Sequence, residues 1–162
     1  MASHIGAPSN SINYHKLKSA IKTTPDNFGE DIKDLFNTYS KNVVEGIIEE
    51  TRSTAIFGSE LLKATLMPEE SEGGSAKPRK RRLWRKYAKS WTVTEKGGEG
   101  SNFYRATVHN KKHYRLTHLL EYGHYTRNGT HTRAFRHIEP VDKWAVERLE
   151  KEIPEIIKRS GE

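Results

Sequence analysis

The chain has 162 residues, no cysteine and a formal net charge of +7, with 33% apolar and 30% charged residues. This length suits one domain with a modest core, and the lack of cysteine excludes disulfides and thiolate metal sites. No stretch approaches the roughly 20 apolar residues that span a bilayer. The N-terminus lacks the basic start and apolar run of a secretory signal. We therefore expect synthesis in the cytoplasm and no membrane contact.

The charge is unevenly distributed. Residues 1–76 carry 7 Lys/Arg and 11 Asp/Glu, residues 77–136 carry 16 and 3, and residues 137–162 carry 5 and 7. A basic middle therefore lies between two mildly acidic ends. Such a segment either faces nucleic acid or docks on the acidic face of a neighbouring subunit.

The first third of the chain predicts a flexible arm and a long helix. Residues 1–11 are small and polar, which is typical of a flexible arm, and residues 12–22 have the spacing of a short helix. Thr24-Pro25-Asp26 is a helix-start signal. Apolar residues then recur at steps of three and four: Phe28, Ile32, Leu35, Phe36, Tyr39, Val43, Ile47 and Ile48. We expect an amphipathic helix of about 30 residues or more, well above the usual length, whose stripe packs on the core or on another subunit.

Residues 67–86 are predicted to form an extended loop. Acidic residues come first, then Gly-Gly-Ser, and then a run in which seven of ten residues are cationic. This run could contact phosphates, with Trp84 against a base or sugar, or it could tether an acidic partner. The residues concerned are Lys77, Arg79, Lys80, Arg81, Arg82, Trp84, Arg85 and Lys86.

Two strands follow. Residues 87–96 and 102–109 alternate in polarity as half-buried strands do, with a glycine-rich turn at 97–100 between them. Residues 113–122 suit either a third strand or a short helix, and Gly123 ends that element.

The last element is a second helix. It begins at Glu139-Pro140, and Pro154 either ends it or kinks it, in which case Ile156-Ile157 extend it. The expected fold is α+β: an antiparallel sheet packed by a long N-terminal helix and a C-terminal helix, with a long basic loop before the first strand. The domain covers residues 12–158, and residues 159–162 form a tail.

The candidates for chemistry are weak. Six of the eight histidines lie between residues 109 and 137, yet their spacing suits no metal site, and Glu121 is the only carboxylate between residues 100 and 138. Phosphate-binding and nucleophile motifs are absent. Metal-free nuclease chemistry that uses these histidines stays an alternative. We otherwise expect no enzyme, no cofactor and no metal.

Three segments carry a resemblance to a known family. Residues 86–93 (KYAKSWTV), 108–124 (VHNKKHYRLTHLLEYGH) and 136–141 (RHIEPV) resemble patterns of the neck (head–tail joining, tail-component) family of long-tailed bacteriophages. The middle stretch is the most specific of the three. With the first helix, the resemblance covers roughly residues 12–158. Two features depart from the family pattern: the long 68–82 link, and Arg136 where a proline commonly precedes the histidine.

The resemblance implies a small α+β subunit that forms a ring around the channel through which DNA leaves the head. In this interpretation Leu119 and Leu120 fill the core, Glu121 bonds backbone or a neighbouring subunit, Gly123 permits a turn, and Pro140 starts the last helix. The motif positions expected in the core or at a subunit interface are Tyr87, Trp91, Tyr114, His118, Leu119, Leu120, Glu121, Gly123, His124, His137 and Pro140.

The function that we expect is therefore that of a structural virion protein. Its partners would be copies of itself, head-closure or adaptor proteins, tail-tube or tail-terminator proteins, and packaged double-stranded DNA without sequence preference. The alternative is a nucleic-acid-binding module or small nuclease built on residues 77–90 and the histidines.

Overall fold

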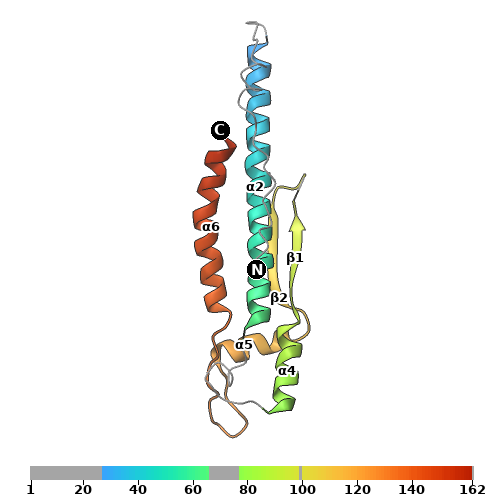
Figure 1. Ribbon diagram of the computed structural model, residues 1–162, viewed down its shortest axis with the longest axis vertical. Coiled ribbons are helices and arrows are strands. Elements are labelled where there is room, and N and C mark those ends of the chain that lie inside the picture. Colours follow the sequence, from blue (N-terminus) through green and yellow to red (C-terminus); the bar gives the residue numbers. More distant parts are fainter. Residues whose placement is uncertain (1–26, 66–76, 99, 162) are drawn as a thin grey trace, which may run out of the picture.

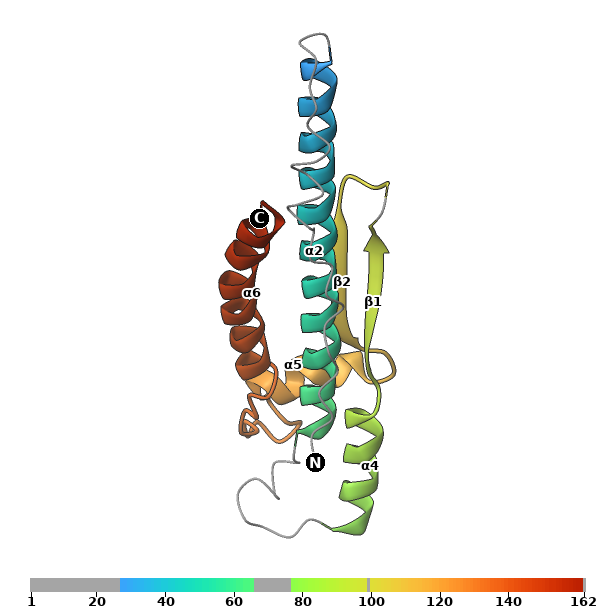
Figure 2. The ribbon, with the colours of Figure 1, turned by 45° about the horizontal axis from the view of Figure 1, so that its top comes forward.

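A computed structural model describes residues 27–65, 77–98 and 100–161. The predicted arm at 1–11, the short helix at 12–22 and the loop at 67–76 lie outside this part of the chain. The molecule is elongated, with helix α2 along its long axis, helix α6 on one side and a β-hairpin on the other (Figure 1). Helices α4 and α5 lie together at one end, which we call the basal end (Figure 2).

Helix α2, Phe28–Ala64, has 37 residues, which corresponds to about 55 Å. The predicted long helix is therefore confirmed, although the described part starts just after the Thr24-Pro25 signal. Two glycines inside it lie where α6 (Glu139–Ser160) packs closely. A Cβ on Gly46 would meet Ile156 Cγ2 at 2.7 Å, and one on Gly58 would meet Val141 Cγ1 at 3.5 Å. Residues that weaken the isolated helix thus allow α6 to approach it.

The cationic run forms a helix, which corrects the prediction of an extended loop through residue 86. Helix α4 covers Pro78–Ala88 and has proline at its first turn. Its arginines, lysines and leucine are good helix formers, and proline suits the first helical position. Tyr87 and Ala88 anchor its end in the core. The run has no apolar period, so only the helix propensity of its residues could have predicted this helix.

The sheet is a single hairpin within the described residues. Strand β1, Trp91–Gly97, pairs antiparallel with β2, Tyr104–Asn110, in a register that sets Trp91 opposite Asn110. It packs against α2 (Figure 1). Residues 113–122, which suited either a third strand or a short helix, form a helix: α5 covers Tyr114–Tyr122.

Helix α6 begins as predicted, with Pro140 in its first turn, but it does not end at Pro154. It continues through that exposed position to Ser160.

The core lies toward the basal end of the molecule. Leu62 of α2, Tyr87 of α4 and Trp91 of β1 form its buried centre. Five partly buried residues pack around them: Trp84, Val108, Leu120, Ile138 and Val141. The α+β fold predicted from the sequence is thus observed. No helix of the described residues has both the length and the apolar character needed to cross a membrane.

Candidate assembly site

Residues of the segments that carry the family resemblance meet at the start of α6. The side chain of Glu121, in α5, is 4% exposed, and it accepts hydrogen bonds from three successive backbone N–H groups. Glu121 Oε2 accepts from His137 N at 2.9 Å and Ile138 N at 3.0 Å, and Oε1 accepts from Glu139 N at 2.9 Å. The residue at the N-cap of α6, Ile138, provides no side-chain cap of its own. A carboxylate 17 residues earlier in the chain therefore caps this helix.

The environment of Glu121 stabilises its charge. Burial alone raises the pKa of this carboxyl, but the three backbone N–H donors and nearby His137 hold the pKa below its ordinary value of 4.5. A carboxylate at the positive end of a helix dipole is also favoured. The expectation that Glu121 bonds backbone is confirmed.

His137 connects this cap to the core. Its Nδ1 lies 2.9 Å from Phe135 O and 3.1 Å from Glu121 Oε2. Because both neighbours are acceptors, Nδ1 carries a proton. On the other side of the ring, Nε2 forms a hydrogen bond with Tyr87 Oη at 2.7 Å. Burial, with a contribution from Glu121, raises the pKa of Tyr87 above its ordinary value of 10.0, so it stays a donor. His137 is therefore a buried residue whose two ring nitrogens both have hydrogen-bond partners.

Asn110 joins α4 to β2 in the same region. It is the most buried large side chain of the described residues, at 1% exposure. Its Oδ1 accepts from Ser90 Oγ at 2.5 Å and His113 N at 2.9 Å, and its Nδ2 donates to Tyr87 O at 2.9 Å. The sequence did not indicate the roles of Asn110 and Ser90. Its only sign of them was their place inside the segments that resemble the phage neck family.

Gly123 is required where α5 ends. Its φ is +72°, and a Cβ there would lie 2.4 Å from Thr132 O. The backbone of residues 131–134 could not approach this closely past any other residue type. The predicted role of Gly123 in the turn is confirmed.

The other motif residues divide between core and surface. Trp91 is buried, and Leu119 and Leu120 are half-buried, with Leu120 against the core. Tyr114, His118, His124 and Pro140 are exposed. They are thus not core residues of a single copy.

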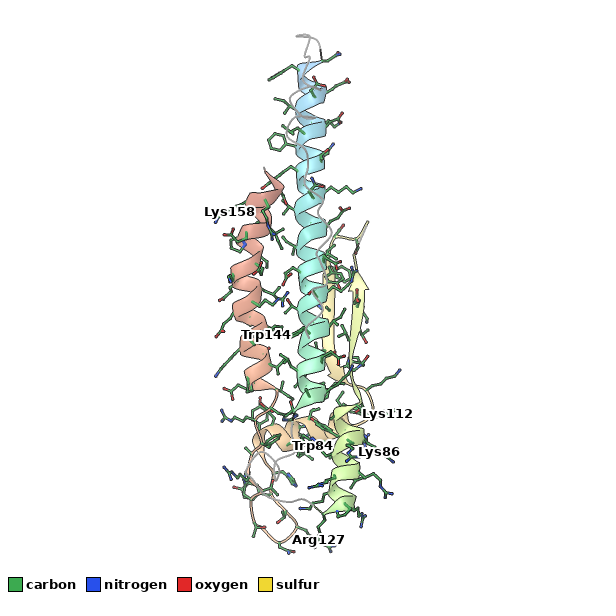
Figure 3. The ribbon with its side chains drawn as sticks, in the orientation of Figure 1. Trp84, Lys86, Lys112, Arg127, Trp144 and Lys158 are labelled. Atoms are coloured by element: carbon green, nitrogen blue, oxygen red, sulfur yellow. The ribbon has the colours of Figure 1, made fainter. Side chains whose placement is uncertain are left out.

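The basal end gathers positive charge. Exposed cations come from α4, from the turn before α5 and from the loop before α6 (Figure 3). They are Arg79, Arg82, Arg85, Lys86, Lys111, Lys112 and Arg127, and Arg115 in the first turn of α5 adds to them. Glu121 lies near this end but is buried in the cap. Trp84 points inward: its Nε1 donates to Thr65 O at 3.1 Å, and its ring packs against Tyr87 and Phe135. Arg79, Arg82, Arg85 and Lys86 of α4 are exposed, whereas Trp84 is turned into the core.

The opposite end of the molecule is apolar and acidic. We call residues 28–36 of α2 the tip, because the end of α6 reaches only Tyr39. Its apolar side chains are exposed: Phe28 57%, Ile32 38%, Leu35 45% and Phe36 64%. The first half of the predicted apolar stripe is therefore not packed on the core. For this half, contact with another subunit stays a prediction.

The histidines do not assemble into a site. The described residues contain no group of three or more His, Asp or Glu side chains placed to hold a metal ion. His118, His124 and His131 are exposed, and His109 and His113 are half-buried.

Comparison with known proteins adds no assignment, since no family model, curated protein or solved structure matches the chain.

Proposed function

We propose that the chain is a structural subunit of a tailed bacteriophage, one of several copies that form a ring joining the DNA-filled head to the tail. The observation that carries the proposal is the exposed apolar tip of a helix far longer than its own core requires. Contiguous exposed apolar side chains mark interaction surfaces. A protein that works as a member of an assembly needs such a surface, whereas a monomeric module does not.

The resembling motif supports the same proposal. Glu121, Gly123 and His137 carry out packing and capping in this fold. Such roles suit a family whose members are defined by shape and assembly rather than by catalysis. In this proposal the ring contacts head-closure or adaptor proteins on one side and tail-tube or tail-terminator proteins on the other.

The test uses the virus that encodes the chain. Deletion of the gene should leave DNA-filled heads and unattached tails in lysates viewed by electron microscopy. An epitope tag at the C-terminus should be labelled by antibody at the head–tail joint in complemented particles. Normal particles after deletion, or label elsewhere in the virion, would contradict the proposal.

A second candidate is binding to nucleic acid through the basal end, which the exposed cations of α4 favour. Such binding would read phosphates and no sequence, and its affinity should fall steeply with salt. Gel-shift titration of duplex DNA against the intact chain tests it. For the nuclease variant of this candidate, His118→Ala should abolish cleavage. An intact chain that neither shifts nor cuts DNA or RNA at low salt removes this candidate.

A further inference from the structure

We propose that the tip of α2 docks on the basal end of a second copy of the chain. This inference rests on the proposed assembly function and specifies the contact through which the copies join. It starts from the two properties of the tip. Its side chains are apolar and exposed, and it carries Glu30, Asp31 and Asp34 against the single cation Lys33. These four charged side chains form no ion pair with a described residue. The partner surface should therefore be both apolar and cationic.

The basal end has these two properties. Arg79, Arg82, Arg85 and Lys86 of α4 are exposed and form no ion pair with a described residue. Exposed aromatic and aliphatic side chains belong to the elements of this end: Leu83 of α4 is 53% exposed, Tyr122 at the end of α5 71%, and Tyr125 in the loop after α5 77%. Tyrosine and arginine are the residue types most enriched at the centres of protein interfaces.

One copy cannot join these two surfaces, because they lie at opposite ends of the elongated molecule (Figure 1). Pairing of two tips would bring acidic side chains together, and pairing of two basal ends would do the same with cations. Like charges brought into contact cost free energy, whereas a tip against a basal end sets opposite charges face to face. The favoured contact therefore joins two different surfaces, which is the type that generates rings when the rotation closes.

Disulfide crosslinking tests this contact, because the chain has no cysteine of its own. Phe36→Cys places one thiol at the tip and Leu83→Cys places one on α4, both at exposed positions. The two variants of the full chain, mixed in equal amounts and oxidised, can give tip–tip, base–base and mixed dimers. We expect the mixed dimer to exceed either like pair by about tenfold, equivalent to about 1.4 kcal/mol of preference. Mass spectrometry of the linked peptides distinguishes the three products.

Charge exchange provides the second arm. Asp31→Lys with Asp34→Lys in the tip, or Arg82→Glu with Arg85→Glu in α4, should each lower the mixed crosslink about tenfold. When the reversed tip is mixed with the reversed basal end, the yield should recover. Glu147→Lys, at an exposed position of α6, is the matched control and should change nothing. A fold defect cannot produce recovery on mixing, so folding failure and loss of contact are separable.

The same cysteine variants are then tested in assembled particles. A majority of tip–tip dimers, or the absence of mixed dimers both from the purified chain and from particles, overturns the proposed contact. So does a mixed crosslink that forms only after residues 1–26 are removed, because the chain's own N-terminal segment would then occupy the tip. Antibody label at the head–tail joint with no mixed dimers leaves the proposed function standing without this contact. Mixed dimers without label at the joint leave the contact between copies standing and contradict the proposed function.

Discussion

At the scale of single residues, Glu121 provides for α6 what an N-cap side chain ordinarily provides from within the same turn. Three otherwise unsatisfied N–H groups receive a buried charged acceptor. Because α5 supplies the carboxylate, the cap also fixes α5 against the start of α6. Its contribution is therefore both local and tertiary, and its removal should affect the whole domain.

Glu121→Gln should lower the free energy of unfolding by about 1.5–3 kcal/mol, the range for hydrogen bonds to charged groups. The amide keeps the shape of the side chain but has one acceptor oxygen instead of two and carries no charge. Chemical denaturation monitored by tryptophan fluorescence measures the loss. Glu155→Gln, at an exposed position paired with Lys158, is the control and should change stability by less than about 0.5 kcal/mol.

The effect of Glu121 should depend on pH in a defined direction. The folded state holds the pKa of Glu121 below its ordinary value of 4.5, so folding favours the ionised form. The stability that this provides is complete above the ordinary pKa and is lost as pH falls through the lower, folded pKa. The gap between the native chain and Glu121→Gln should therefore be constant at neutral pH and narrow below about pH 4.5. Denaturation curves at a series of pH values test this; a gap that widens in acid would contradict it.

Gly123 and Gly129 differ in what an added Cβ atom would meet. Both have positive φ, +72° and +78°, but a Cβ at Gly129 would have nothing within 4 Å, whereas one at Gly123 meets Thr132 O at 2.4 Å. Gly129→Ala should cost about 1–2 kcal/mol for the left-handed conformation alone. Gly123→Ala should cost more than that, since its backbone (φ +72°, ψ +174°) lies in a region essentially restricted to glycine, and the 131–134 backbone must also move. Equal losses in thermal unfolding would contradict this expectation.

At the scale of elements, the glycines of α2 provide a second comparison. Gly29 has open space around it, whereas a Cβ at Gly46 would lie 2.7 Å from Ile156 Cγ2. Gly29→Ala should stabilise the helix by up to about 1 kcal/mol through propensity alone. Gly46→Ala should lose that gain, because α6 must shift away from α2. Amide hydrogen exchange in α6 should rise for Gly46→Ala and stay unchanged for Gly29→Ala.

The elements that the sequence predicted well were those with a clear period. Helices α2 and α6 and both strands follow apolar spacing, so their type could be predicted, as could the glycine at the end of α5. Helix α4 could not be predicted this way, because its inward side chains, Trp84 and Tyr87, are too few to show a period. Pro154 was predicted to end or kink α6, and only the first of these is wrong, because the helix continues through this exposed position to Ser160.

The buried polar residues Glu121, His137 and Asn110 were predicted only in part. The resemblance identified Glu121, Gly123 and His137, but periodicity could not indicate that Asn110 would be the most buried large side chain. Its position depends on α4 and β2 meeting, which is a tertiary event. Likewise, the spacing of Phe28, Ile32 and Phe36 indicated an apolar face and could not indicate that no described element covers it.

At the scale of the whole molecule, the core and the proposed assembly surface lie in different regions. The core and the buried hydrogen bonds of Glu121, His137 and Asn110 lie toward the basal end, whereas the tip lies beyond α6 and contributes nothing to either (Figure 2). The charges are arranged along the same axis, with cations at the basal end and carboxylates at the tip. A contact between such ends should weaken as salt screens it, since the Debye length falls from about 10 Å at 0.1 M to about 3 Å at 1 M.

This separation makes a prediction about the tip. Phe28→Ser with Phe36→Ser should change the free energy of unfolding by less than about 0.5 kcal/mol, because both side chains are more than half exposed. The same double variant should lose self-association, because the apolar area that would be buried between copies is gone. Sedimentation velocity over a concentration series measures association, and urea denaturation measures folding. Phe103→Ser, at an equally exposed position, 58%, before β2, is the control and should leave both unchanged. If the tip variant unfolds more readily, the tip belongs to the core of a single copy; if it still associates, other surfaces join the copies.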